Sequence, residues 1–222
     1  MSGGGDTMLV EIWSDVLCPW CYLGKRRFEA ALARFEHRDA VDVVWRSFEL
    51  RADEPTVPGR SLLDVMAGYG LDREAALERF EHIRQLGEAE GLTLNLTTAR
   101  PVNTFDAHRL THWAAAHGLR GELKERLFRA YHTENLNVAD HDVLAGLAGE
   151  VGLDADQARE VLAGDAFGED VRADERRARE VGVGAVPTFL VDGRRTTAGA
   201  MSADVLLNLL ETAWSERQPH HV

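Results

Sequence analysis

The chain of 222 residues contains two cysteines, Cys18 and Cys21, which are separated by Pro19 and Trp20. Two thiols at this spacing can form a disulfide, exchange it with other thiols, or supply two ligands to a metal ion. A cysteine attacks a disulfide as its thiolate, so a redox role requires surroundings that stabilise the anion and leave it accessible. The elements on either side of the pair therefore decide which chemistry to expect.

The cysteines lie where a predicted strand gives way to a predicted helix. Residues 8–14 are largely apolar on both faces, which predicts a central strand covered on both sides. From Pro19 to about Phe35, apolar residues recur at helical spacing, and the first turn of a helix tolerates proline. Cys18 then stands at the helix N-terminus, where unpaired N–H groups and the helix dipole stabilise a thiolate. We predict that Cys18 attacks the substrate and that Cys21, one turn further on, resolves the mixed disulfide.

Three other roles are open to the pair. A zinc site would need two more ligands, and a chain without further cysteines could offer only histidines. A structural disulfide that closes so small a loop would constrain the unfolded chain little. Two buried, unreactive thiols are the third alternative. The strand-to-helix setting favours the redox role, and we expect no metal ion at this pair.

The chain beyond Cys21 has strand patterns near its two ends and helical patterns between them. A second strand is predicted at residues 41–48, and residues 54–59 form a turn-rich linker. From about Ser61 to Val181 the apolar residues follow helical spacing almost throughout. Predicted helix caps precede three of these segments, at Asp72, Asn103 and Asp154.

Strand signals return at residues 187–191. Asp192 and Gly193 form a strong hairpin signal, and residues 194–199 supply the partner strand. Ser202 then caps a final amphipathic helix. A strand-helix-strand unit and a single hairpin are each too small to be stable alone, so the two ends of the chain are predicted to share one sheet.

The predicted fold is therefore α/β with a large all-helical insertion. Its expected parts are a discontinuous α/β domain at residues 8–58 and 183–216, an inserted helical domain at residues 59–182, and flexible tails at residues 1–7 and 217–222.

Composition and charge exclude several classes of protein. The formal net charge of −12 argues against nucleic-acid binding, which needs a basic face. No apolar stretch is long enough to span a bilayer, and the first seven residues lack the basic and hydrophobic segments of a signal peptide. We expect a cytoplasmic protein with no nucleic-acid or membrane partner, where a single CxxC pair is more often catalytic or metal-binding than structural.

Three segments resemble the DsbA-like thioredoxin-fold oxidoreductases, in particular their cytoplasmic FrnE-type branch. They are residues 11–21 around the cysteines, residues 103–110 and residues 186–189. The similarity extends over about residues 8–216, and it implies a thioredoxin-like fold that carries the helical insertion. The 2-hydroxychromene-2-carboxylate isomerases and the kappa-class glutathione transferases are relatives of the same architecture.

The resemblance also assigns residues that support the cysteines. In this fold a cis-proline loop faces the active-site disulfide, and Val186 and Pro187 match that loop. The backbone of Val186 is then expected to pair with an extended substrate peptide. Between the cysteines, Pro19 and Trp20 set the redox character. Because Trp20 offers no cation to the Cys18 thiolate, we expect an intermediate reduction potential.

Two acidic residues near the cysteines each have two interpretations. Glu11 is the only charge in the first predicted strand. It is either a buried carboxylate that accepts the proton of Cys21 or a group that faces solvent at the end of the strand. Asp15 either disfavours the Cys18 thiolate by repulsion or shapes the turn before the helix.

The segment between residues 103 and 112 carries further candidates. His108 and His112 are one helical turn apart, a spacing compatible with metal binding, but no acidic or cysteine partner aligns with them, so ordinary core or surface histidines are favoured. Asn103 is first of all a helix cap. The family resemblance makes Asn103 and His108 candidates for lining a substrate groove between the two domains.

Together these features predict a thiol-disulfide oxidoreductase that acts on protein or small-molecule thiols and disulfides. It would bind no cofactor beyond its own disulfide, with glutathione as a candidate co-substrate and an unidentified redox partner to reset it. The alternative is a glutathione-dependent isomerase or transferase of the 2-hydroxychromene-2-carboxylate isomerase type. Those relatives generally carry serine where Cys18 stands, so the intact pair favours the oxidoreductase. A binding module with vestigial thiols is a third possibility.

Overall fold

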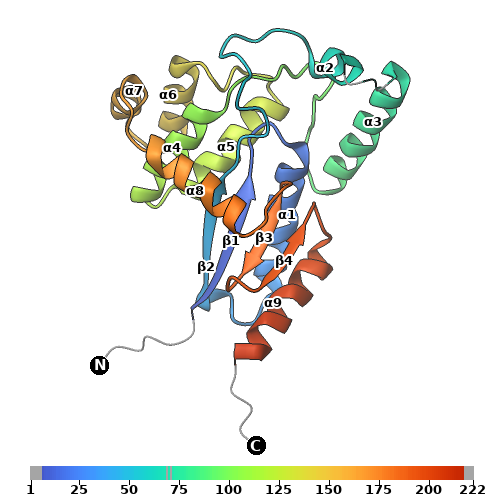
Figure 1. Cartoon of the computed structure of the whole chain (residues 1–222), viewed down its shortest axis with the longest axis vertical. Coiled ribbons are helices and arrows are strands. Elements are labelled where there is room, and N and C mark those ends of the chain that lie inside the picture. The colour runs from blue at the N-terminus through green and yellow to red at the C-terminus, as the bar shows by residue number, and fades with distance from the viewer. Residues whose placement is uncertain (1–6, 69, 71, 218–222) are drawn as a thin grey trace, which may run out of the picture.

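In the computed structural model, which describes residues 7–68, 70 and 72–217, four strands form one sheet in the order β2-β1-β3-β4 (Figure 1). Strand β1 runs parallel to β2 and antiparallel to β3, and β3 is antiparallel to β4. The two ends of the chain therefore share one sheet, as predicted. The strands are β1 (Met8–Ser14), β2 (Val41–Ser47), β3 (Thr188–Val191) and β4 (Arg195–Ala198).

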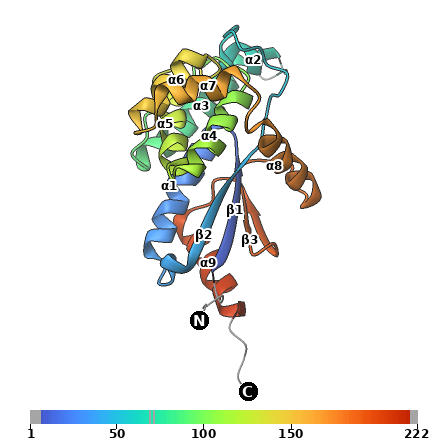
Figure 2. The same ribbon diagram turned by 90° about the vertical axis from the view of Figure 1, so that its left-hand side faces the viewer.

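Helices cover both faces of this sheet. On one face, α1 (Pro19–Arg34) and α9 (Ala203–Arg217) pack against Val10 and Ile12 of β1. On the other face, α8 (Gly168–Glu180) packs against Trp13, whose indole N–H donates to the carbonyl of Asp174 at 3.1 Å. Figure 2 shows α1 and α8 on opposite sides of the strands. Burial of each large apolar side chain of β1 contributes roughly 1.5–3 kcal/mol.

The remaining helices form the insertion at the end of the sheet where β1 and β2 finish (Figure 1). Its core contains Leu110, Leu127 and Tyr131 together with Val16 and Leu17, which precede the first cysteine. Helix α8 falls within the predicted insertion, yet it packs against β2 as well as α4. After a short 3-10 helix (Arg38–Ala40), the helices are α2 (Leu62–Gly68), α3 (Arg73–Ala89), α4 (Phe105–Ala116), α5 (Arg120–His132), α6 (His141–Glu150) and α7 (Ala155–Ala163). None of the described helices is long and apolar enough to cross a membrane.

The predicted hairpin joins β3 to β4. Asp192 and Gly193 have φ values of 50° and 66° and form the centre of a turn in which the N–H of Arg194 donates to the carbonyl of Val191 at 3.0 Å. Val191 pairs with Arg195, so the loop between the strands has three residues, 192–194. The carboxylate of Asp192 also accepts a hydrogen bond from the backbone N–H of Leu9 and forms an ion pair with Arg217. Arg217 is the last residue of α9, so its assignment to a flexible tail was wrong. The rest of the predicted tails, except Thr7, lies outside the described residues.

Of the three predicted caps, Asp154 and Asp72 occupy the expected position, and the cap predicted at Asn103 is displaced by one residue. Asp154 accepts hydrogen bonds from the backbone N–H groups of the first turn of α7, as predicted. Asp72 directly precedes α3, but its side chain makes no capping bond. At α4 the cap position is Thr104, while the side-chain oxygen of Asn103 accepts the N–H of Phe105 at 2.9 Å.

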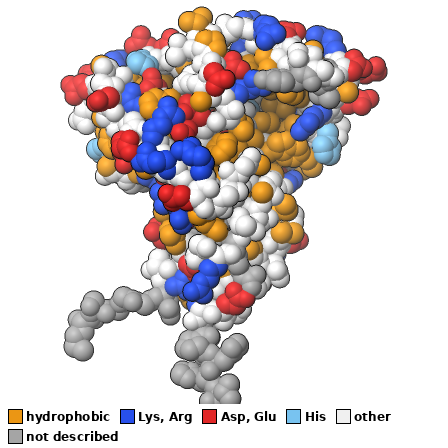
Figure 3. Space-filling view, in the orientation of Figure 1, with side chains coloured by type: hydrophobic (Ala, Val, Ile, Leu, Met, Phe, Trp, Pro, Cys, Tyr) orange, Lys and Arg blue, Asp and Glu red, His pale blue; other side chains and the backbone are white. Residues whose placement is uncertain are grey.

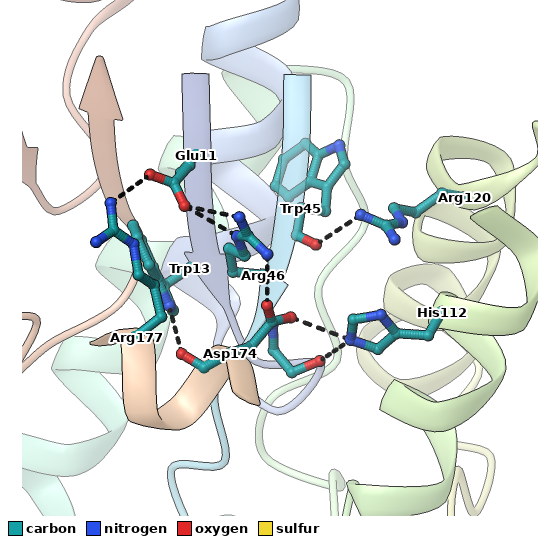
Figure 4. A network of polar contacts seen from close by, with 9 residues as sticks. Glu11, Trp13, Trp45, Arg46, His112, Arg120, Asp174 and Arg177 are labelled. Atoms are coloured by element: carbon teal, nitrogen blue, oxygen red, sulfur yellow. Dashed lines mark hydrogen bonds and ion pairs between the residues drawn. The ribbon is translucent and has the colours of Figure 1, made fainter. Parts of the chain in front are cut away.

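A network of buried charges joins the sheet to α8 and α4 (Figure 4). Glu11 accepts hydrogen bonds from Arg46 at 2.8 and 3.0 Å, and Arg46 also donates to Asp174 at 2.8 Å. Asp174 further accepts the backbone N–H of Ser47 at 2.8 Å and lies 3.0 Å from the ring of His112. Each of the two buried carboxylates is therefore paired with cationic groups, as the burial of a charge requires, and Arg46 is shared between them.

Replacing Asp174 by alanine should lower the free energy of unfolding by about 3–5 kcal/mol, because Arg46 and His112 would lose their buried anion. Urea unfolding at neutral pH measures this change. Asp204→Ala is the matched control, since it removes an exposed ion pair with Arg34 and should cost less than about 1 kcal/mol. Equal losses of unfolding free energy in the two variants would show that the buried network stabilises the fold no more than an exposed ion pair does.

The Asp174→Ala variant also tests how the stability of the fold depends on pH. Burial raises the pKa of Asp174, but the hydrogen bonds from His112, Ser47 and Arg46 outweigh it and hold this pKa below its ordinary value of 3.8. The ionised carboxylate therefore stabilises the fold fully above 3.8, and the stabilisation is lost as the pH falls through the lower folded-state pKa. Asp174→Ala should flatten this acid limb of the stability profile.

Candidate active site

The first cysteine caps the first helix. Cys18 has extended backbone geometry, Pro19 is the first residue of α1, and the Cys18 carbonyl accepts the N–H of Cys21 at 3.0 Å. Both cysteines are free thiols; Cys18 is 5% exposed and Cys21 is fully buried. Cys18 thus stands at the helix N-terminus and Cys21 lies one turn further along the helix, the two positions that the sequence predicted.

The loop before β3 faces this pair. The peptide bond between Val186 and Pro187 is cis, and the carbonyl oxygen of Val186 accepts a hydrogen bond from the Sγ of Cys18 across 3.6 Å. The expected cis-proline loop is therefore confirmed in conformation and in position, although it lies 168 residues along the chain from Cys18.

Gly24 allows the loop to come this close. A β-carbon at Gly24 would lie 2.8 Å from Cγ of Pro187, which is closer than two carbon atoms can pack, and 3.5 Å from the ring of Phe189. A proline ring cannot swing away as a flexible side chain could. No local sequence pattern singles out Gly24, because the need for glycine arises only from the contact between α1 and the loop.

A buried polar cluster lies beneath the cysteines. Asp15 is fully buried, and its carboxylate accepts the backbone N–H of Leu50 at 2.7 Å and lies 3.4 Å from Nε2 of His108. Burial raises the pKa of Asp15, but the hydrogen bond and charge of His108 and the N–H of Leu50 outweigh it and lower this pKa. Burial lowers the pKa of His108. Burial, together with Cys18 and then Asp15, raises the pKa of Cys21 well above its ordinary value.

Helix α5 supplies two further buried groups. His132 is fully buried, its ring stacks on those of Tyr22 and Phe128, and burial lowers its pKa to about 4. Lys124 is also buried, and burial lowers its pKa to about 8. The sequence pattern did not indicate either residue, because each occupies a helical position that is typical of an ordinary polar side chain. Only tertiary structure turns them towards the cysteines.

A cavity of about 400 Å³ opens beside Cys18. Figure 3 shows it as an apolar hollow between α3 and the rest of the insertion. Arg51 and Arg79 contribute its charged lining. Its apolar lining includes Trp20, Leu62, Met66, Phe80, Ile83 and Tyr131. Such a lining suits an apolar group of a bound molecule. Among the described residues, no group of three or more His, Cys, Asp or Glu side chains is placed to hold a metal ion.

Comparison with known proteins identifies the family. The model of the DSBA-like thioredoxin domain matches residues 9–211, nearly the whole chain. The chain belongs to the DsbA-like thioredoxin family. A Bacillus subtilis relative, the uncharacterized protein YwbO, is 30% identical over 214 residues, which cover 96% of this chain and 98% of YwbO. The predicted thioredoxin-like fold with its helical insertion is thereby confirmed.

Solved structures agree with this assignment. The probable DsbA oxidoreductase SCO1869 from Streptomyces coelicolor is 41% identical, with a TM-score of 0.91 over 97% of this chain and 93% of that one. The cytosolic disulfide reductase DsbM from Pseudomonas aeruginosa has a TM-score of 0.64 over 94% of this chain and 99% of its own, and at 21% identity it shows the fold alone.

Three residues that were predicted to contribute to the active site of the DsbA-like chain lie elsewhere: Glu11, Asn103 and His108. Glu11 is buried, but it points to the face of the sheet covered by α8, where Arg46 and Arg177 bind it. Because side chains alternate along a strand, Glu11 cannot share the α1 face of β1 with Val10 and Ile12. The ionisable groups that raise the pKa of Cys21 are Cys18 and Asp15.

The two groove candidates are also corrected. Asn103 uses its side chain within the protein, where its amide donates to the carbonyl of Ala52 at 2.8 Å and its oxygen accepts from Phe105. His108 is fully buried against Asp15. Neither lines the cavity beside Cys18, whose walls come from α2, α3, Pro101, Tyr131 of α5 and the segments around residues 17–20 and 50–51.

Gly24→Ala should lower the free energy of unfolding by about 1–3 kcal/mol, because the added methyl group collides with Pro187. The control is Gly146→Ala in α6, where a β-carbon meets no atom within 4 Å and alanine should stabilise the helix by about 0.5–1 kcal/mol. Urea unfolding of both variants measures the difference in sign. An unchanged Gly24→Ala protein would show that the loop is not packed this tightly.

Proposed function

We propose that the DsbA-like chain is a thiol-disulfide oxidoreductase that reacts through Cys18. The observation that carries the proposal is the position of this thiol. It stands at the N-terminus of α1, lines an apolar cavity, and faces the carbonyl of Val186 at 3.6 Å. Unpaired N–H groups at the start of a helix stabilise the thiolate that attacks disulfides.

The exchange proceeds in two balanced steps. The Cys18 thiolate attacks one sulfur of a substrate disulfide, forms a mixed disulfide and releases the other sulfur as a thiolate that takes up a proton. Cys21 then loses its proton and attacks Cys18, which forms the Cys18–Cys21 disulfide and releases the second substrate thiol. The substrate is reduced by two electrons and the protein is oxidised; the reverse sequence oxidises a dithiol.

The substrates proposed are protein or small-molecule thiols and disulfides that place an apolar group in the cavity. The backbone of Val186 is the proposed pairing edge for an extended peptide. A redox partner must return the cysteines to their starting state, and glutathione is the candidate co-substrate for that step. We assign the protein to the FrnE-type branch and to the cytoplasm, where DsbM is described as a disulfide reductase.

The glutathione-dependent isomerase remains the alternative. It would use the same cavity beside residue 18 without redox turnover. The thiol at Cys18 and the second thiol one turn away serve a redox cycle, whereas isomerisation requires neither to change oxidation state.

Replacing Cys18 by serine should abolish reduction of insulin disulfides and disulfide isomerisation, because no nucleophile remains at the helix N-terminus. Cys21→Ser should retain the first step and accumulate a mixed disulfide between Cys18 and the substrate, which mass spectrometry detects. Redox turnover that persists in Cys18→Ser would contradict the proposal. Glutathione-adduct isomerisation that survives this substitution would favour the alternative.

The reduction potential of the Cys18–Cys21 pair should lie between those of thioredoxin and DsbA, about −270 and about −120 mV. The reason is that Trp20 brings no cation to the Cys18 thiolate. Equilibration with glutathione buffers of known ratio measures the potential. A value as oxidising as that of DsbA would refute this expectation, and Trp20→His should move the potential towards it.

A further inference from the structure

Lys124 is a lysine at a place where lysines are rarely found. It lies in α5 and is 1% exposed. Its ammonium group lies 5.7 Å from the ring centres of both Trp45 and Phe128. Within the described part of the chain it forms no ion pair or hydrogen bond. A buried ammonium group costs several kcal/mol unless an anion compensates it, and two aromatic faces offset only part of that cost.

Several charged or titratable groups act on Lys124 from the elements packed around it. Most of them are already engaged. Asp15 accepts the N–H of Leu50, and Asp174 binds Arg46 and His112. These groups come from α1, the loop before it, α4, α5 and α8, and they are Cys21, Asp15, His108, Arg120 and Asp174.

Cys21 is the group in this set that becomes charged only during the reaction. Burial raises its pKa, so the resting thiol is neutral. To resolve a mixed disulfide or to leave a broken one, its sulfur must carry a negative charge at a fully buried position. Burial lowers the pKa of Lys124 to about 8, so Lys124 is still mainly an ammonium ion at neutral pH. The ammonium group of Lys124 packs on Phe128, which belongs to the same buried cluster as Cys18 and Cys21. The cation without an ion-pair partner therefore lies beside the cluster in which the transient anion forms.

We propose that Lys124 is a positioning residue that supplies the counter-charge for the Cys21 thiolate. The inference rests on the proposed redox function and deepens it. When Cys21 gives up its proton to solvent and attacks Cys18 of the mixed disulfide, the ammonium group stabilises the thiolate until the new sulfur–sulfur bond forms. In the reverse direction it stabilises Cys21 as the leaving thiolate. The helical insertion thus contributes an electrostatic group to chemistry on the thioredoxin-like domain.

The test separates the two thiols by their kinetics. The reduced full-length protein is mixed with 5,5′-dithiobis(2-nitrobenzoate), an aromatic disulfide whose thiolate product absorbs visible light. Attack by Cys18 releases one equivalent of this product and leaves a mixed disulfide. Resolution by Cys21 releases the second equivalent. Stopped-flow absorbance over a range of pH gives the rate of each phase.

Lys124→Met should slow the second phase at neutral pH by roughly tenfold or more and move its pH profile upward, since one unit of pKa changes the thiolate fraction about tenfold. The first phase should change by less than about twofold. Lys124→Arg keeps the charge and should recover most of the second-phase rate. If the methionine variant does not fold, Lys124→Gln replaces it in the comparison with arginine.

Lys25→Met is the matched control. Lys25 is also buried, on the helix that carries Cys21, but Glu29 and Glu125 already neutralise it at 2.6 and 2.8 Å. Its second phase should keep the wild-type pH profile. A second phase that is unchanged in Lys124→Met, or equally slowed in Lys124→Arg or Lys25→Met, overturns the role of the Lys124 charge.

The proposed function fails separately from this inference. Absence of both phases in the wild type, or two phases that persist in Cys18→Ser, would refute the redox function itself. A normal first phase with an unaltered second phase in Lys124→Met would refute only the counter-charge.

Discussion

The close contact between the start of α1 and the cis-proline loop is the constraint on which the site depends. It brings the Cys18 thiol to the carbonyl of Val186, 168 residues away in sequence. The contact exists because Gly24 has no β-carbon to meet Pro187. Strand β3, which pairs with β1, fixes the loop on one side, and the packing of α1 on the same sheet fixes the helix on the other.

The helical insertion completes the site from the far side. Its core includes Val16 and Leu17, so the segment that leads into the cysteines is held by the insertion as much as by the sheet. Helices α2 and α3 wall the apolar cavity beside Cys18, and α5 places Lys124 and His132 beneath the pair. A change in the insertion can therefore alter substrate choice through the cavity and thiol chemistry through the buried charges.

Charge is distributed unevenly between the two faces of β1. The face covered by α8 holds Glu11, whose carboxylate is neutralised by Arg46 and Arg177 and belongs to a network that joins sheet and insertion. The face covered by α1 and α9 is apolar. Around Cys21 the acidic group is instead Asp15, which follows the strand and is held by Leu50 and His108. The ion pairs of Glu11 thus lie on one face of β1, and the acidic group that acts on Cys21 lies just beyond the end of this strand.

The sequence by itself determined the strands, the main helices, the hairpin at Asp192 and Gly193 and the position of the two cysteines at the start of the first helix, because these depend on local periodicity and turn chemistry. The resemblance to a family located Pro187. Tertiary structure alone decided which face Glu11 occupies, that Asn103 and His108 serve the protein interior, and that Gly24 and Lys124 adjoin the site. Each of these depends on contacts between residues far apart in the chain, and no local pattern specifies such contacts.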